Sequence, residues 1–247
     1  MDATLLVNLS QQLAAYRSMD VIANNLANVS TAGFKRESTK FEEYVQHLPD
    51  DGSNPDGPQA LSFVMDRGLV RDTSEGRMDR TGAPYDLAIS GKGFFVVKTA
   101  AGDRYTRNGH FTLDSQGRIS TEGGELLQGE GGEVSVTSDD GDINIAVDGT
   151  ITGRQGQLGK LRVVQFDNER AMTKDGNSLY STDQAPTPAT TAAIHQGMIE
   201  SSNVQPVLEI SNMLEVMRAY QAATNIADSQ DKLSREAIQK LGAAPTS

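Results

Sequence analysis

The sequence of 247 residues contains no cysteine and no tryptophan. Without cysteine it offers no disulfide, no thiolate ligand for a metal and no cysteine nucleophile, and it is indifferent to the redox state of its compartment. Aromatic residues make up only 5% of the chain, whereas there are 24 glycines. This composition indicates many turns and a modest core, so we expect an elongated molecule rather than one dense globule.

Long apolar runs are also missing. Runs such as Phe94–Val97 are far too short to cross a bilayer, so we expect no membrane insertion. Polar residues from Asn8 onwards interrupt the apolar start of the chain, and we expect no cleaved Sec-type signal peptide. A net charge of −11 opposes binding to nucleic acid and to anionic membranes.

Residues that mark catalytic or metal sites are few. The three histidines, His47, His110 and His195, show no metal-ligand spacing. The segment Ser90–Gly93 fails the spacing of a phosphate-binding loop, and Asp139–Asp142 lacks the later ligands of an EF-hand. We therefore expect no enzymatic activity, no metal and no cofactor.

The two ends of the chain are predicted to be helices. From Asp2 to Val29 apolar residues recur at steps of three, four or their sum, which predicts a helix with one apolar stripe. Gly33 lies just beyond this segment, where a C-terminal cap or turn would use a residue that tolerates positive φ. The segment from Val207 to Leu241 is predicted as a longer helix bounded by Pro206 and Gly242. It carries two apolar rows: one with Val207, Ile210, Leu214 and Met217, the other with Met213, Val216, Tyr220, Ala223 and Ala227.

Two rows on different faces suggest that the longer helix contacts several neighbours, because one partner would leave the second row in water. Our hypothesis is that Leu214, Met217 and nearby residues pair in coiled-coil fashion with the apolar stripe of the first helix, while the second row faces other subunits. The stripe consists of Leu6, Leu9, Leu13, Tyr16 and Leu26. An ordinary amphipathic helix on its own core is the alternative.

Between the helices the apolar period changes to two, as in Ile143–Val147, which favours β-strands. Asn108-Gly109 predicts a hairpin turn between residues 105–107 and 110–113, and Asp148-Gly149 predicts another. Further strands are predicted at Leu87–Ile89, Phe94–Lys98, Glu133–Val136 and Leu161–Phe166. The predicted fold class is α+β, with an antiparallel, mainly β middle domain inserted between two pairing helices.

The predicted domain order has five parts. They are the helix and following loop at 1–36, an extended or β connector at 37–80 with an exposed loop at 48–60, the β domain at 81–190, a connector and helix at 191–242, and a tail at 243–247.

Three amides, Asn24, Asn25 and Asn28, stand in five positions of the first helix, where asparagine has low helix propensity. They bond neighbouring backbone or subunits and set the register, or they mark a helix end that frays toward Gly33. Both interpretations stay open at this point.

Three stretches resemble the flagellar rod and hook protein family. Residues 23–36 (ANNLANVSTAGFKR) are similar to its N-terminal signature. Residues 86–97 and 105–117 resemble its middle-domain motif, and Gly197–Val204 with Met217–Gln221 resembles its C-terminal motif. The stretch Arg67–Asp72 and the ending Ala237–Gly242 are most like the proximal rod proteins, with distal rod or hook-type proteins as the alternative.

The resemblance implies a structural subunit of the basal-body rod, exported through the flagellar type III apparatus and stacked helically with itself and other rod proteins in the periplasm. A secreted, β-rich glycan-binding protein or hydrolase of the cell wall is the competing class. The residues expected at assembly interfaces are Leu6, Leu9, Leu13, Tyr16, Asn24, Asn25, Leu26, Asn28, Gly33, Phe34, Val207, Ile210, Leu214, Met217 and Tyr220.

Overall fold

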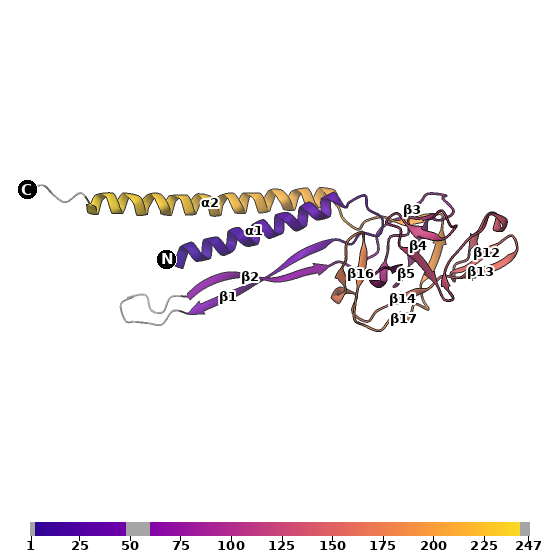
Figure 1. Ribbon diagram of the computed structural model, residues 1–247. Helices are drawn as coiled ribbons and strands as arrows, with labels where there is room; N and C mark the ends of the chain where they lie inside the picture. The colour runs from indigo at the N-terminus through magenta and orange to yellow at the C-terminus, as the bar shows by residue number, and fades with distance from the viewer. Residues whose placement is uncertain (1–2, 48–59, 243–247) are drawn as a thin grey trace, which may run out of the picture. The chain divides into compact units, whose positions relative to one another are not determined.

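The computed structural model describes residues 3–47 and 60–242 (Figure 1). Both predicted helices are present, as α1 (Ala3–Ala27) and α2 (Pro206–Gly242). The predicted loop at 48–60 lies, up to residue 59, outside the described residues, as does the predicted tail at 243–247. Neither α1 nor α2 is long and apolar enough to cross a membrane.

The chain divides into two compact units. Unit 1 contains α1 up to Leu26, the strands β1 (Glu37–His47) and β2 (Ala60–Arg71) up to Val70, and α2. Unit 2 contains residues 27–36 and 71–205. The five-part division made from the sequence stays a prediction.

In unit 1, α1 has a neighbour on two sides (Figure 1). The strands β1 and β2 form a two-stranded hairpin, and the hydroxyls of Ser18 on α1 and Thr39 on β1 lie 3.2 Å apart. On the other side, the amide of Asn8 donates to the carbonyl of Ala223 on α2 at 2.9 Å. The helix therefore packs against both the hairpin and α2.

Unit 2 is the mainly antiparallel β region that the alternating pattern predicted. Its strands are β3 (Met78–Arg80), β4 (Leu87–Ser90), β5 (Phe94–Thr99), β6 (Gly102–Thr106), β7 (Phe111–Leu113), β8 (Ile119–Thr121), β9 (Leu126–Gly129), β10 (Gly132–Glu133), β11 (Asn144–Ile145), β12 (Thr150–Gly153), β13 (Gly156–Lys160), β14 (Val163–Gln165), β15 (Thr173–Lys174), β16 (Leu179–Ser181), β17 (Thr187–Pro188), β18 (Ala193–Gln196) and β19 (Met198–Glu200). Short 3-10 turns occur at Ser138–Asp140 and Glu169–Ala171.

Strand β5 lies at the centre of the main sheet, where it pairs with β6, β9 and β14. Phe95 and Val97 point into the larger core, in which the rings of Phe95 and Phe111 meet edge-on at 5.3 Å. Phe94 and Val96 belong to a second core on the other face. Because both faces of β5 are buried, the strand is a continuous apolar run rather than an alternating one.

Most of the predicted strands are present. β4, β5 and β14 confirm strands within Leu87–Ile89, Phe94–Lys98 and Leu161–Phe166, whereas Glu133–Val136 is a strand only at its first residue. The turn at Asp148-Gly149 is confirmed, because it joins the antiparallel strands β11 and β12.

The hairpin predicted at Asn108-Gly109 is wrong. Strand β6 pairs with β5 and β16, and β7 pairs with β8, so the strands on either side of this dipeptide do not pair. A Cβ at Gly109 would lie 1.5 Å from the carbonyl oxygen of Leu87, whose N–H donates to the carbonyl of Gly109 at 2.9 Å. Glycine stands here because two backbones approach closely, not because a tight turn needs positive φ.

We expect Gly109→Ala to lower the free energy of unfolding by about 1–3 kcal/mol, because the added methyl group meets backbone that has no room to move. The matched control is Gly131→Ala, since a Cβ at Gly131 would have no heavy atom within 4 Å. Urea denaturation of both variants measures the difference. Equal effects at the two positions would contradict the close-packing role of Gly109.

Candidate functional site: helix surfaces and a buried junction

Two hydrogen bonds between α1 and α2 determine which face of α2 turns inward. Besides the bond from Asn8 to Ala223, the amide of Asn25 donates to a carboxylate oxygen of Glu209 at 3.2 Å. Glu209, Val216 and Ala223 follow one another at intervals of seven residues and lie on one face. That face is the inner one, since Glu209 and Ala223 are buried and Val216 is half-buried.

The intramolecular pairing expected for Leu214 and Met217 is therefore wrong. Both side chains are 51% exposed, and Leu214 lies five residues after Glu209, or about 140° around the helix. The row expected to face other subunits instead turns inward: Ala223 is buried and Met213 and Val216 are half-buried, while Tyr220 at the edge of the row is exposed. The polar bonds at Glu209 and Ala223 select this row.

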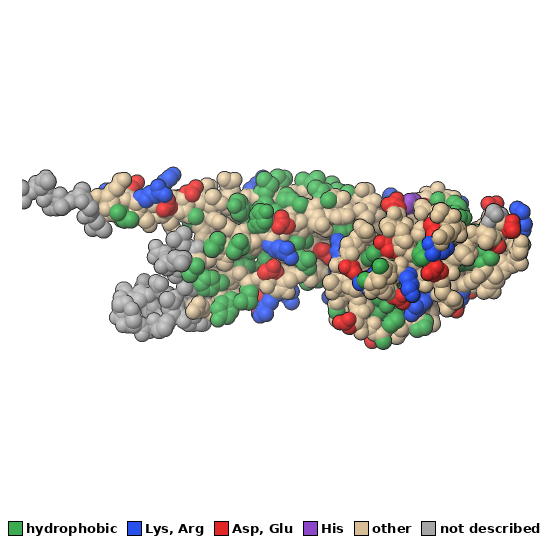
Figure 2. All heavy atoms as spheres, in the orientation of Figure 1, with side chains coloured by type: hydrophobic (Ala, Val, Ile, Leu, Met, Phe, Trp, Pro, Cys, Tyr) green, Lys and Arg blue, Asp and Glu red, His purple; other side chains and the backbone are tan. Residues whose placement is uncertain are grey.

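The apolar stripe of α1 is also largely exposed. Leu6, Leu9, Leu13 and Tyr16 are between 41% and 62% exposed, and only Leu26 at the end of the stripe is half-buried. On α2, Val207 is 75% exposed, Ile210 and Tyr220 are also exposed, and hydrophobic side chains gather along the visible face of both helices (Figure 2). The helices of unit 1 thus present large apolar side chains to their surroundings.

Asn25 is fully buried and holds three segments of unit 1 together. Its amide group donates to the carbonyl of Glu37 at 2.7 Å and accepts from the N–H of Glu37 at 3.0 Å, in addition to its bond with Glu209. One side chain therefore links α1 to the first residue of β1 and to the first turn of α2. Of the two interpretations left open, the one in which the side-chain amide bonds neighbouring backbone applies to Asn25.

The other two asparagines differ from Asn25. Asn24 is exposed, whereas Asn28 is half-buried in unit 2 and its side-chain oxygen accepts from the hydroxyl of Thr31 at 3.2 Å. This bond, together with the one from the N–H of Thr31 to the carbonyl of Asn28, shapes the turn after α1.

Glu200 is a buried carboxylate of unit 2 on which two buried cations converge. It is 0% exposed, lies 2.5 Å from Nζ of Lys35 and 3.4 Å from a guanidinium nitrogen of Arg107, and accepts from the N–H of Gly76 at 2.8 Å. Lys35 and Arg107 are buried as well. Each of the three residues comes from a different one of the three sequence motifs, so the fold brings all three motifs together at one charge cluster.

The two cations at Glu200 have further partners. Lys35 donates to the carbonyl of Ser74 at 2.7 Å, and Arg107 donates to the carbonyls of Ile89 and Gly91 at 3.1 and 2.7 Å. These carbonyls offset the cost of burying two positive charges against one negative charge.

Gly33 and Phe34, expected at assembly interfaces, are buried in the same junction. The N–H of Gly33 donates to the carbonyl of Glu200 at 2.7 Å, and a Cβ at Gly33, which has φ +67°, would lie 2.4 Å from backbone of Arg107. Phe34 is almost fully buried, with Nζ of Lys174 4.3 Å from its ring centre. The glycine is required both by its φ and by close packing.

Asn203, which the sequence did not single out, holds several backbone segments of unit 2 in place. Its side-chain oxygen accepts from the N–H of Arg36 at 2.7 Å, and its amide group donates to the carbonyls of Asp72 and Ser74 at 3.0 and 3.2 Å. Nearby, hydrogen bonds from the N–H and hydroxyl of Ser74 lower the pKa of the Asp72 carboxyl. The amide thus joins the chain segment that precedes the β1–β2 hairpin in the sequence to the segment that follows it.

Sequence reasoning also missed the roles of Glu200, Lys35 and Arg107. The available signal was that each is a charged residue within one of the three motifs. Such residues are seldom fully buried unless paired.

The described part of the chain contains no group of three or more His, Asp or Glu side chains placed to hold a metal ion. Nδ1 of His110 lies 2.7 Å from the buried carboxylate of Asp86, and Nε2 lies 3.6 Å from Glu122. The contact with Asp86 orients the imidazole beside the β4 strand.

We expect Asn25→Ala to destabilise unit 1 by about 1–3 kcal/mol, because the buried N–H and carbonyl of Glu37 lose their partner. Denaturation followed by helical circular dichroism measures the effect. Asn225→Ala, at an exposed position of α2, is the control. If both variants unfold at the same denaturant concentration as the parent chain, Asn25 belongs to a frayed end.

We expect Glu200→Gln to lower the free energy of unfolding of unit 2 by about 3–5 kcal/mol, because two buried cations lose their counter-charge. The control is Glu130→Gln, which removes a 3.3 Å ion pair with Lys160 at an exposed position and should change stability by less than about 1 kcal/mol. The double variant Glu200→Gln with Lys35→Met should recover part of the loss. A neutral effect of Glu200→Gln would disprove the role of the cluster.

Comparison with known proteins links these motifs to one family. A family described as Flagella basal body rod protein matches residues 7–35. The Flagellar hook protein FlgE/F/G D1 domain matches residues 88–153, and the Flagellar basal body rod FlgEFG protein C-terminal family matches residues 195–240. The three matches contain Lys35, Arg107 and Glu200, respectively.

Whole-chain relatives agree. The chain is 40% identical to the flagellar basal-body rod protein FlgF of Caulobacter vibrioides, over 98% of this chain and 99% of the relative. It is 32% identical to FlgF of Mesorhizobium japonicum over the same shares, and 35% identical to the rod protein FlgG of Buchnera aphidicola over 91% and 92%. The chain therefore belongs to the flagellar basal-body rod protein family.

Proposed function

We propose that this structural rod subunit assembles through the outward apolar rows of its terminal helices. The rows are Leu6, Leu9, Leu13 and Tyr16 on α1, and Val207, Ile210, Leu214 and Met217 on α2. The observation that carries the proposal is their exposure in the single chain. Contiguous apolar surface of this kind marks protein interfaces, because a soluble monomer gains by hiding it.

The energy available to such an interface is substantial. Complete burial of an aliphatic side chain contributes about 1.5–3 kcal/mol, so burying the exposed half of each side chain contributes about 1 kcal/mol. Four residues in each row would then contribute several kcal/mol per contact before the entropic cost of association is subtracted. Repeated along a helical assembly, these contacts hold subunits in register.

The occupants of these rows are further copies of the chain and neighbouring proximal and distal rod proteins. We further propose that the chain crosses the inner membrane through the flagellar type III export apparatus without a cleaved signal, stacks in the periplasm and transmits motor torque without catalysing a reaction. The family membership and the exposed helices support this. The polar bonds of Asn25 keep the rows facing outward in each subunit.

Leu214→Asp is expected to abolish incorporation into the basal body and motility while leaving the stability of the isolated chain within about 0.5 kcal/mol, because Leu214 has no intramolecular seam to disrupt. Sedimentation of basal bodies and swimming assays, with the variant expressed in a strain that lacks the parent gene, measure incorporation and motility. Denaturation of the isolated chain measures stability.

The matched control is Ala219→Asp, an exposed position on the same helix about 140° away from Leu214. Both substitutions place the same charge in the same helix, so a common effect on helix propensity cancels. Normal assembly of the Leu214→Asp chain would overturn the proposed interface. Equal loss of assembly at both positions would show that a charge on either face of α2 blocks assembly, and that the apolar row is not the specific interface.

A further inference from the structure

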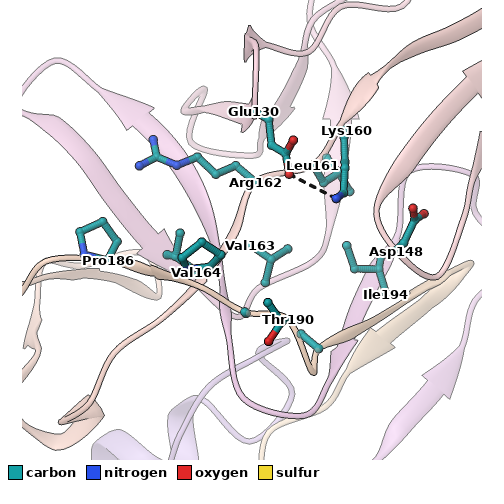
Figure 3. A pocket seen from close by; sticks show the side chains of 13 residues that line it. Glu130, Asp148, Lys160, Leu161, Arg162, Val163, Val164, Pro186, Thr190 and Ile194 are labelled. Carbon is teal, nitrogen blue, oxygen red and sulfur yellow. Dashed lines mark ion pairs between the residues drawn. The ribbon is translucent and has the colours of Figure 1, made fainter.

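A pocket of about 440 Å³ lies in unit 2, between the chain that runs from β13 into β14 and the chain that runs from β17 into β18 (Figure 3). Its volume is within the range of sites that bind small molecules or single side chains. Its base is formed by the buried Leu161 and Ile194 and the half-buried Val163, which packs against the same core, and Pro186 and Pro188 contribute apolar rings. Neither the helices nor the Glu200 junction takes part in it.

The base of the pocket is built rigidly. The N–H of Leu161 donates to the carbonyl of Gly149 at 2.8 Å, and the N–H of Ala189 donates to the carbonyl of Val163 at 3.1 Å. Behind it, a Cβ at Gly93 would lie 2.9 Å from Val163, so this glycine lets the strands pack closely. A preformed apolar base needs little reorganisation when a ligand binds.

The rim carries charge of both signs, unequally distributed. Glu130 and Lys160 form an exposed ion pair at 3.3 Å, and Asp148 lies on the same side of the pocket (Figure 3). Hydrogen bonds from the N–H and hydroxyl of Thr150, together with the positive charge of the Lys160 ammonium nearby, lower the pKa of the Asp148 carboxyl, which is therefore ionised at neutral pH. Two carboxylates thus share one ammonium at this end.

Arg162, elsewhere on the rim, is paired with Asp103 at 3.4 Å. The end of the pocket near Glu130 and Asp148 therefore has an excess of one negative charge, and the net charge of −11 over the chain adds to the attraction of cations. Exposed ion pairs such as Glu130–Lys160 are weak, so a competing cation can replace the ammonium at little cost.

We propose that this pocket binds an aliphatic side chain of a partner peptide that carries a positive charge on the adjacent residue. The aliphatic group lies on the base formed by Leu161, Val163 and Ile194, and the cation lies against Glu130 and Asp148. The partner is thus a segment with a basic residue next to Leu, Ile or Val. This inference is independent of assembly through the helices.

Three blocked dipeptides test the proposal on the full-length monomeric chain: N-acetyl-Leu-Lys-amide, N-acetyl-Leu-Gln-amide and N-acetyl-Leu-Glu-amide. We expect the lysine peptide to shift NMR signals of residues 160–164 and 189–194 with a dissociation constant of about 1 mM, and to bind about two- to fivefold more tightly than the glutamine peptide. The glutamate peptide should bind most weakly.

Two variants distinguish recognition of the positive charge from nonspecific apolar binding. Glu130→Gln should reduce the preference for the lysine peptide about two- to fivefold, and Lys160→Gln should increase it by a similar factor, because the competing ammonium is gone. Equal binding of the three peptides, signal changes outside the pocket only, or no change at about 10 mM peptide would each overturn the proposal.

Discussion

The junction of the three motifs in unit 2 depends on the burial of one carboxylate. Removing an ion from water is costly, and the cost is offset only when the charge meets opposite charge and hydrogen-bond donors at good distances. Glu200 meets this condition with Lys35, Arg107 and the N–H of Gly76. These groups come from segments that lie far apart in the sequence, so the charge cluster forms only when the chain adopts this topology.

This requirement explains why the residues around the cluster have so little freedom. Gly33 carries no side chain because backbone of Arg107 occupies the space, and Gly76 carries none because a Cβ would lie 1.8 Å from the carbonyl oxygen of Ser201. A charge buried this deeply tolerates no loosely packed neighbour, since water entering the site would compete for the same donors. The three motifs are therefore three parts of one structural element in unit 2.

Unit 1 has polar groups among its inner contacts and large apolar side chains on its surface. Its inner contacts include the polar groups of Asn8, Asn25 and Glu209, whereas Leu9, Leu13 and Leu214 are about half exposed. Polar bonds are directional, so they set the register and rotation of a helix, while apolar contacts of equal area leave both free to slide. In a subunit of a larger structure this arrangement is physically reasonable, because the neighbours supply the missing core.

The sequence by itself determined the two terminal helices, the β character of the middle and the family, because periodicity, glycine positions and long motifs are local properties of the chain. It did not determine which apolar row of α2 turns inward, since both rows have helical spacing and only the bonds of Glu209 and Ala223 with α1 distinguish them. Nor did it show that Asn108-Gly109 is a close backbone contact, or that Lys35, Arg107 and Glu200 meet. Those facts depend on residues brought together over long sequence separations, and only the tertiary structure decides which distant groups share a low-dielectric interior.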